Sequence, residues 1–115
     1  GRRLKSYINA LIADNIDIIK DEPDIDEEAL NFLWMLKTIT DSADFEPYLK
    51  VISYSAKIED YGTALFYLEE LLKNGYTDHK KLYALEHTAL FRIMPEFNKV
   101  VAKYLKDARY EVIEE

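Results

Sequence analysis

The stretch Asp60-Tyr-Gly-Thr-Ala-Leu-Phe-Tyr-Leu-Glu-Glu-Leu-Leu-Lys-Asn-Gly75 carries a helix start signal, an apolar stripe and a helix stop signal. Asp60 is a residue type that caps helix N-termini. Lys73 places a cation at the negative end of the helix, and Gly75 can take the left-handed conformation that follows a last turn. The stretch therefore predicts one helix of a packed helical hairpin. Its inward face comprises Tyr61, Ala64, Leu65, Leu68, Leu71 and Leu72.

The residues before this stretch predict three more helices. Apolar residues spaced three or four apart indicate a first helix over about residues 4–19, which Pro23 separates from the next one. Asp24, with Glu27 three residues later, predicts the start of a second helix that ends near Ile39. Apolar residues cover most of the circumference of this second helix, so we expect it to be the most enclosed one.

The third helix and the helices after Gly75 are shorter. Asp44 is the expected cap of the third helix, which has Pro47 in its first turn. Thr77 or Asp78 is the expected cap of a short fifth helix, and Pro95 opens a sixth.

Between the fifth and sixth helices, residues 91–94 are expected to form a turn with apolar anchors. Residues 110–115 fit a helix extension, a strand or a connection to another domain. No segment shows the alternation typical of strands. We therefore predict an all-α fold of five or six helices, stacked as antiparallel hairpins.

Composition limits the class of protein. The chain has 115 residues, 49% of them hydrophobic and 32% charged, which is typical of one globular domain, whether complete or a piece of a longer protein. The net charge of −7 disfavours nucleic acid and anionic lipid surfaces as partners. The apolar segments are too short for membrane insertion. The absence of cysteine excludes disulfides and leaves the compartment open, cytoplasmic or secreted.

The third and fourth helices together resemble one tetratricopeptide repeat. That family pairs two antiparallel helices over about 34 residues, with a small residue where they approach most closely. Ala64 is similar to that small residue, Tyr61 to the aromatic that often precedes it, and Tyr48 to the large residue near the start of the first helix. The resemblance covers about Phe45–Lys106, and the chain is degenerate elsewhere. It implies a stack of helical hairpins, a tetratricopeptide-like superhelix.

A second stretch adds to this resemblance. Arrays of this family in bacterial proteins often end in a degenerate pair with an apolar-x-x-Pro-x-Phe turn. The residues similar to that turn are Leu90, Ile93, Pro95 and Phe97. The resemblance implies fold much more strongly than function.

Few residues have the spacing of a chemical site. Six of the eight residues from Asp21 to Glu28 are acidic, but the ligand order of a calcium loop is missing, and a capped helix start explains them. His79 and His87 are eight residues apart, whereas zinc-binding histidines usually lie three or four apart. No nucleophile elbow and no glycine-rich phosphate loop occurs. We therefore expect no metal site, no cofactor and no catalytic residue.

Four residues form the candidate partner-binding groove. Lys99, Lys103 and Lys106 make a basic stripe on the last helix, which either grips an acidic peptide or is the solvated face of that helix. Tyr67 lies off the apolar stripe of its own helix, so it either lines a groove or packs on a neighbouring helix.

The leading hypothesis is a module that binds a protein or peptide and has no catalytic activity of its own. Because such arrays in bacteria are frequently appended to hydrolases, the resemblance also implies a role as accessory to a catalytic domain. One alternative is a small-molecule-binding bundle with a pocket lined by Trp34, Tyr67 and the two histidines. Another is a homodimeric structural module that uses its second helix as the interface.

Overall fold

The computed structural model describes residues 2–105 and shows seven helices, with no β-strand in this part of the chain. The helices are α1 (Arg2–Ile19), α2 (Glu27–Thr40), α3 (Glu46–Lys57), α4 (Tyr61–Lys73), α5 (His79–Tyr83), α6 (Ala89–Arg92) and α7 (Pro95–Tyr104). The predicted all-α fold is confirmed. The expectations for Lys106 and for residues 110–115 lie outside the described residues.

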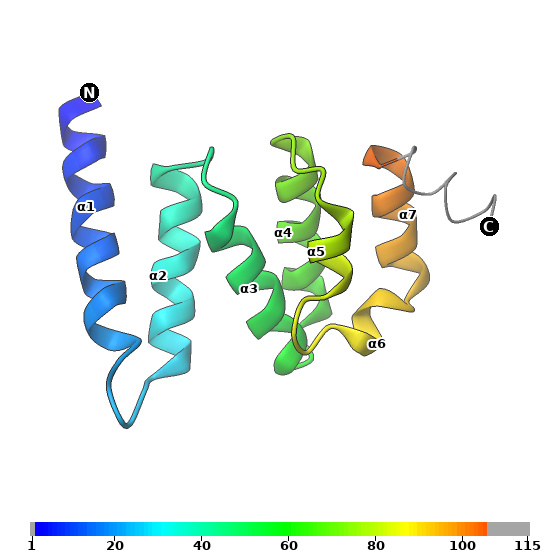
Figure 1. Ribbon diagram of the computed structural model, residues 1–115, viewed down its shortest axis with the longest axis horizontal. Helices are drawn as coiled ribbons and strands as arrows, with labels where there is room; N and C mark the ends of the chain where they lie inside the picture. The colour runs from blue at the N-terminus through cyan, green and yellow to red at the C-terminus, as the bar shows by residue number, and fades with distance from the viewer. Residues whose placement is uncertain (1, 106–115) are drawn as a thin grey trace.

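The long helices stand side by side in one row; α1 to α4 alternate in direction, and α7 runs in the same direction as α4 (Figure 1). α1 packs against α2, α2 against α3, α3 against α4, and α4 against α7. The molecule measures 46 × 35 × 21 Å, so it is a flat slab. α1 forms one end of the row, where it has a packed neighbour on one side only (Figure 1).

The hydrophobic core lies between α3, α4 and α7. Ile52 on α3 and Leu68 on α4 are completely buried, and Phe97 and Val101 of α7 close the core from the other side. The most deeply buried residues of the predicted stripe on α4 are Ala64, Leu68, Leu71 and Leu72. The inward face predicted for this helix is therefore confirmed.

The ends of α4 and the start of α5 form as the sequence predicts. The Asp60 side chain accepts a hydrogen bond from the Thr63 backbone N–H at 3.2 Å, which satisfies one of the free donors at the helix start. Gly75 has a φ of 97°, the left-handed conformation that lacks a steric cost only for glycine. Asp78, and not Thr77, caps α5 by accepting from the Lys81 N–H at 3.1 Å.

Two of the predicted caps are wrong by one or two positions. Asp26, not Asp24, caps α2, because Asp26 has the extended backbone directly before the helix and accepts from the Ala29 N–H at 3.0 Å. Asp44 does not hold the cap position of α3, which Phe45 occupies. Asp44 still accepts from the first N–H of that helix at 3.2 Å, so it stabilises the same end.

The expectation that the second helix is the most enclosed is wrong. Only Asn31 and Thr38 of α2 are buried, whereas α3 buries most of its apolar residues and α4 buries half of them. α2 packs mainly against α1 and α3, with Tyr67 of α4 beside Thr38, and part of its apolar surface stays uncovered by the described helices. Phe32 and Ile39 are more than half exposed for this reason.

The segment after α5 also differs from the prediction. His87 has a φ of 65°, which a continuous helix cannot contain, so the expected fifth helix is divided into α5 and α6. Phe91 of α6 is completely buried, but Ile93 is 74% exposed. The predicted turn over residues 91–94 is therefore partly helical, and Ile93 is not one of its anchors.

Candidate partner-binding groove

The four residues predicted to bind a partner lie on two helices. Tyr67 is half-buried on α4, whereas Lys99 and Lys103 are exposed on α7. Lys106 lies outside the described residues. α4 and α7 pack against each other, so the two helices present neighbouring surfaces.

Tyr67 and Lys103 lie on opposite sides of α4. The Tyr67 phenol lies beside Thr38 of α2; burial raises its pKa, and a hydrogen bond with Thr38 partly offsets that rise. Lys103 instead donates to Oε2 of Glu69 at 3.3 Å. Residues two apart in a helix point about 200° away from each other, so Tyr67 and Glu69 face different neighbours. Tyr67 and Lys103 therefore do not line one groove, and partner binding by the lysines stays a prediction.

The Glu69 carboxylate should titrate below the usual glutamate range. Hydrogen bonds from Lys103 and from the Tyr104 hydroxyl, the latter at 3.1 Å, lower its pKa because both favour the ionised form. A lowered folded-state pKa means that this contact contributes stability above the unfolded-state pKa. The contribution is lost as the pH falls through the folded-state pKa.

Carbon-13 NMR of the Glu69 carboxyl group during a pH titration measures this effect. In Lys103→Met and in Tyr104→Phe the pKa of Glu69 should rise toward its ordinary value. Lys99→Met, one turn earlier on the same helix, should leave it unchanged. An ordinary pKa in the unaltered protein would contradict the hydrogen-bonded arrangement.

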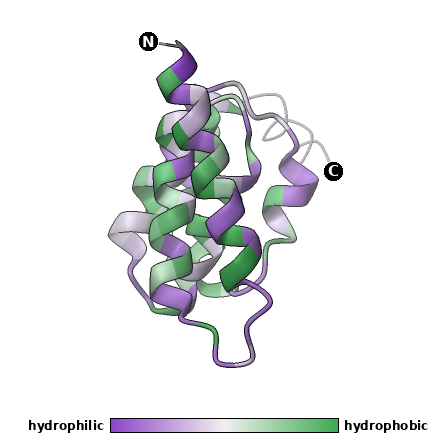
Figure 2. Ribbon diagram, turned by 90° about the vertical axis from the view of Figure 1, so that its left-hand side faces the viewer, coloured by the Kyte–Doolittle hydropathy of each residue, from purple (hydrophilic) through white to green (hydrophobic). Residues whose placement is uncertain are grey.

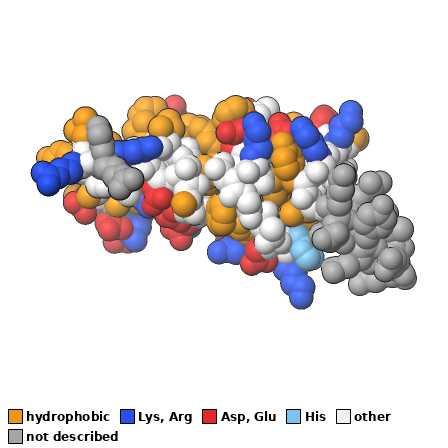
Figure 3. All heavy atoms as spheres, turned by 90° about the horizontal axis from the view of Figure 1, so that it is seen from above, with side chains coloured by type: hydrophobic (Ala, Val, Ile, Leu, Met, Phe, Trp, Pro, Cys, Tyr) orange, Lys and Arg blue, Asp and Glu red, His pale blue; other side chains and the backbone are white. Residues whose placement is uncertain are grey.

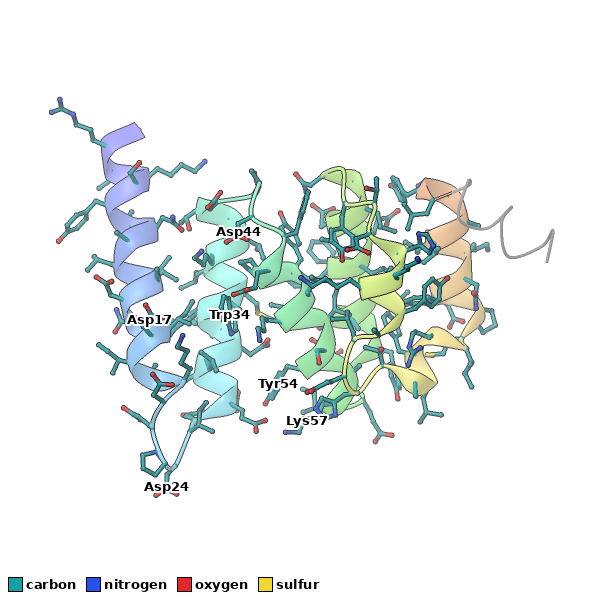
Figure 4. All side chains as sticks on the ribbon, in the orientation of Figure 1. Asp17, Asp24, Trp34, Asp44, Tyr54 and Lys57 are labelled. Carbon is teal, nitrogen blue, oxygen red and sulfur yellow. The ribbon has the colours of Figure 1, made fainter. Side chains whose placement is uncertain are left out.

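A second surface, which the sequence did not predict, lies between α2 and the end of α3. It is an open depression of about 660 Å³. We call it the α2–α3 groove, and its apolar lining consists of Ala29, Phe32, Met35, Tyr54 and Ile58. Phe32 and Ile58 are more than half exposed although both are large and apolar. Figure 4 shows Tyr54 and its neighbour Lys57 near the end of α3, on the side of α2. Such an exposed apolar surface is typical of a binding site.

Asn31 contributes an unpaired polar group beside this lining. Its side chain is about nine-tenths buried, and its Oδ1 has no hydrogen-bond partner within residues 2–105. A buried acceptor without a donor costs about 1–3 kcal/mol.

The edge of the α2–α3 groove is acidic. Asp26 and Glu28, from the start of α2, line it directly. Lys57 lies beside the groove, but its ammonium is paired with Glu27 at 2.8 Å, so its charge is largely neutralised. Glu28 forms no salt bridge with the residues that the structure describes. The groove therefore combines an apolar floor with a negative edge.

The pocket expected for a small molecule does not form from the predicted residues. Trp34 and His87 line a depression of about 220 Å³, which is small for a ligand site. Tyr67 and His79 are not among its lining residues, because Tyr67 faces Thr38 and His79 begins α5. The structure brings together two of the four predicted residues.

The acidic and histidine residues form no metal site in the part of the chain that is described. Within residues 2–105, no three His, Asp or Glu side chains come together as they would around a metal ion. The run from Asp21 to Glu28 instead forms the loop after α1 and the first turn of α2, where Asp24 lies at the tip of the loop (Figure 4).

The groove residues carried one sequence signal. Phe32, Met35 and Ile39 recur at spacings of three and four, which defines a stripe on α2. In a sequence, this stripe cannot be distinguished from a second core-facing stripe. The exposure of Phe32 and Ile39 shows that no helix covers it.

The chain matches no family model, no curated protein and no solved structure. None of the described helices combines the length and the apolar character that a bilayer crossing requires.

Proposed function

We propose that this domain is an interaction module that binds a peptide segment of another protein in the α2–α3 groove and performs no catalysis itself. The single observation that carries the proposal is the apolar cluster between two helices in which Phe32 and Ile58 are exposed and Met35 and Tyr54 are half-buried. A shallow apolar groove between helices suits an amphipathic helix, which places apolar residues at spacings of three and four into it.

The acidic edge favours a basic partner. Asp26 and Glu28 flank the apolar floor, and the whole chain carries a net charge of −7. Complementary charge on the partner increases the rate of association and selects its orientation. The proposed ligand is therefore an amphipathic segment with Lys or Arg beside its apolar anchors.

The likeness of α3 and α4 to a tetratricopeptide repeat supports the same class of function. The two helices are antiparallel neighbours, and Ala64, the small residue of the resemblance, is completely buried between them. Arrays of such hairpins act by positioning other proteins. Within a longer chain, the domain would hold a partner near a catalytic domain.

Selection of peptides from a displayed random library tests the proposal. We expect the selected peptides to combine helically spaced apolar residues with Lys or Arg. Phe32→Glu should weaken their binding by about tenfold or more, because losing a buried aromatic anchor costs more than 1 kcal/mol at many interfaces.

Phe66→Glu is the matched control. Phe66 is also a phenylalanine within a long helix, and it is 59% exposed against 58% for Phe32, but it does not line the groove. The control should bind the peptides as the unaltered protein does. Equal binding by Phe32→Glu, or an equal loss in both variants, would contradict a site in the α2–α3 groove.

A further inference from the structure

α1 has two apolar faces, of which only one is covered. Ile12 and Ile16 are buried on the side of α2. A second set of apolar residues on the same helix is exposed, namely Leu4, Tyr7, Leu11 and Ile18, and Ile8, which is 39% exposed, lies between this set and the buried pair. Leu11 is 44% exposed, and the other three are more than 60% exposed.

The exposed set forms one continuous stripe. At about 100° per residue, its four members fall within an arc of about 60°, and this arc is centred about 130° from the buried pair. Figure 2 looks onto the α1 end of the row and shows hydrophobic residues along the foremost helix, between hydrophilic ones. A helix with a stripe of this kind normally buries it against another helix. We call these four residues the outer stripe.

The charges on α1 run opposite to the order that stabilises an isolated helix. Arg3 and Lys5 lie near its N-terminus, and its first turn has no acidic residue. Asp14 and Asp17 lie toward its C-terminus, and its last turn has no basic residue, although Lys20, directly after the helix, pairs with Asp17 at 3.2 Å. Figure 3 shows Lys and Arg side chains at the α1 end of the face where this helix begins, and others further along the row. Within one helix, this order opposes the macrodipole.

The same charge order is favourable between two antiparallel copies of α1. The basic start of each helix then lies beside the acidic end of the other, and the two macrodipoles oppose each other. The outer stripe has matching symmetry, because Leu4 and Ile18 lie equally far from Leu11 along the chain. A surface that complements itself in this way fits an isologous two-fold interface.

We propose that α1 pairs antiparallel with α1 of a second copy of this chain. The two-fold axis passes beside Leu11, and Leu4 packs against Ile18 of the partner subunit. Arg3 then lies near Asp17 of the partner subunit, on the same flank of the stripe. This interface differs from the one first expected on the second helix, since α2 is flanked by α1 and α3.

The dimer is independent of the function proposed for the α2–α3 groove. No α1 residue lines that groove, so each copy keeps its own site. Two sites held in one dimer would bind a partner with repeated segments more tightly than one site does. The net charge of −7 on each chain opposes association, and a single helix pair is a small interface. We therefore expect a weak dimer, with a dissociation constant in the micromolar range.

Sedimentation equilibrium of the whole chain, at concentrations up to about 1 mM, tests the proposal. The unaltered protein should dimerise, and Leu11→Glu should be monomeric, because it places two carboxylates at the two-fold axis. Leu90→Glu is the control, since Leu90 is also exposed and apolar but lies on α6, and it should dimerise normally. Circular dichroism of each variant checks that the helices are intact.

A charge exchange tests the antiparallel direction. Arg3→Asp and Asp17→Arg should each weaken the dimer at least severalfold, and the double variant should restore it. The two residues are fourteen positions apart in α1, about 21 Å, so they cannot restore each other within one chain.

Three results would overturn the proposal: a monomer at every concentration, a dimer that Leu11→Glu leaves intact, or a double variant as weak as the single ones. The first excludes self-association, the second places it on another face, and the third excludes antiparallel pairing.

Discussion

Replacing Phe91 with alanine is expected to lower the free energy of unfolding by about 3–5 kcal/mol. Phe91 comes from α6, a helix of only four residues, yet its side chain is completely buried. Its ring lies 5.0 Å from the Phe97 ring in an edge-on arrangement and stacks on Tyr61 at 6.0 Å. Removing it leaves a cavity where α4, α6 and α7 meet, and it ends two aromatic contacts.

Denaturant unfolding followed by circular dichroism measures this change. Ile93→Ala is the matched control from the same turn, and it should change the free energy of unfolding by less than about 1 kcal/mol, because Ile93 is mostly exposed. The sequence alone did not distinguish the two residues, because Phe91 and Ile93 both lie in the turn that was expected to carry apolar anchors. A larger loss in Ile93→Ala than in Phe91→Ala would therefore contradict the structure of this segment.

Replacing Ala64 with leucine is expected to lower the free energy of unfolding by about 1–3 kcal/mol. Ala64 is completely buried in the hydrophobic core that Ile52 and Leu68 share. No space is available there for three more carbon atoms, so α3 and α4 must separate or adopt strained side-chain conformations.

Ala89→Leu provides the control for Ala64→Leu. Ala89 is also a helical alanine, but it is exposed at the start of α6. This variant should unfold within about 0.5 kcal/mol of the unaltered protein. Thermal unfolding of both variants measures their stability relative to the unaltered protein. Equal stability of Ala64→Leu and the unaltered protein would show that α3 and α4 do not approach closely at this point.

The features that sequence patterns predicted correctly are local. Asp60 and Gly75 mark the ends of α4 through the conformations that their own backbones and side chains favour. The apolar stripe on α4 could be assigned to the core from its pattern alone, because a helix in the middle of a row has neighbours on both sides. For this reason the helical class and the α3–α4 hairpin could be predicted without a structure.

The features that were missed depend on which neighbours a helix has. The apolar residues of α2 suggested enclosure, but their exposure is set by the position of α2 near one end of the row. The contrast between Phe91 and Ile93 depends on which side of α6 faces the core, because residues two apart in a helical turn point about 200° away from each other. The left-handed backbone of His87 lies just before this helix. The sequence does not signal a left-handed backbone at position 87, because glycine or asparagine, and not histidine, usually adopts that conformation.

The candidate site was missed for a similar reason. Phe32 and Ile58 lie 26 residues apart in the sequence, and each belongs to an apolar pattern that predicts a side chain facing the core. Only the packing of α3 against α2 brings them to one groove and leaves them open to solvent. In contrast, Lys99 and Lys103, two of the lysines predicted to bind a partner, are exposed, and Lys103 is paired with Glu69.

Binding in the α2–α3 groove is tested most directly by NMR titration of the nitrogen-15-labelled chain with a peptide selected as described above. Saturable shifts should concentrate on the backbone amides around Phe32, Met35, Tyr54 and Ile58. They should be absent in Phe32→Glu at the same peptide concentration. Shifts that concentrate on Lys99 and Lys103 of α7 instead, or that spread evenly over the molecule, would contradict the proposed site.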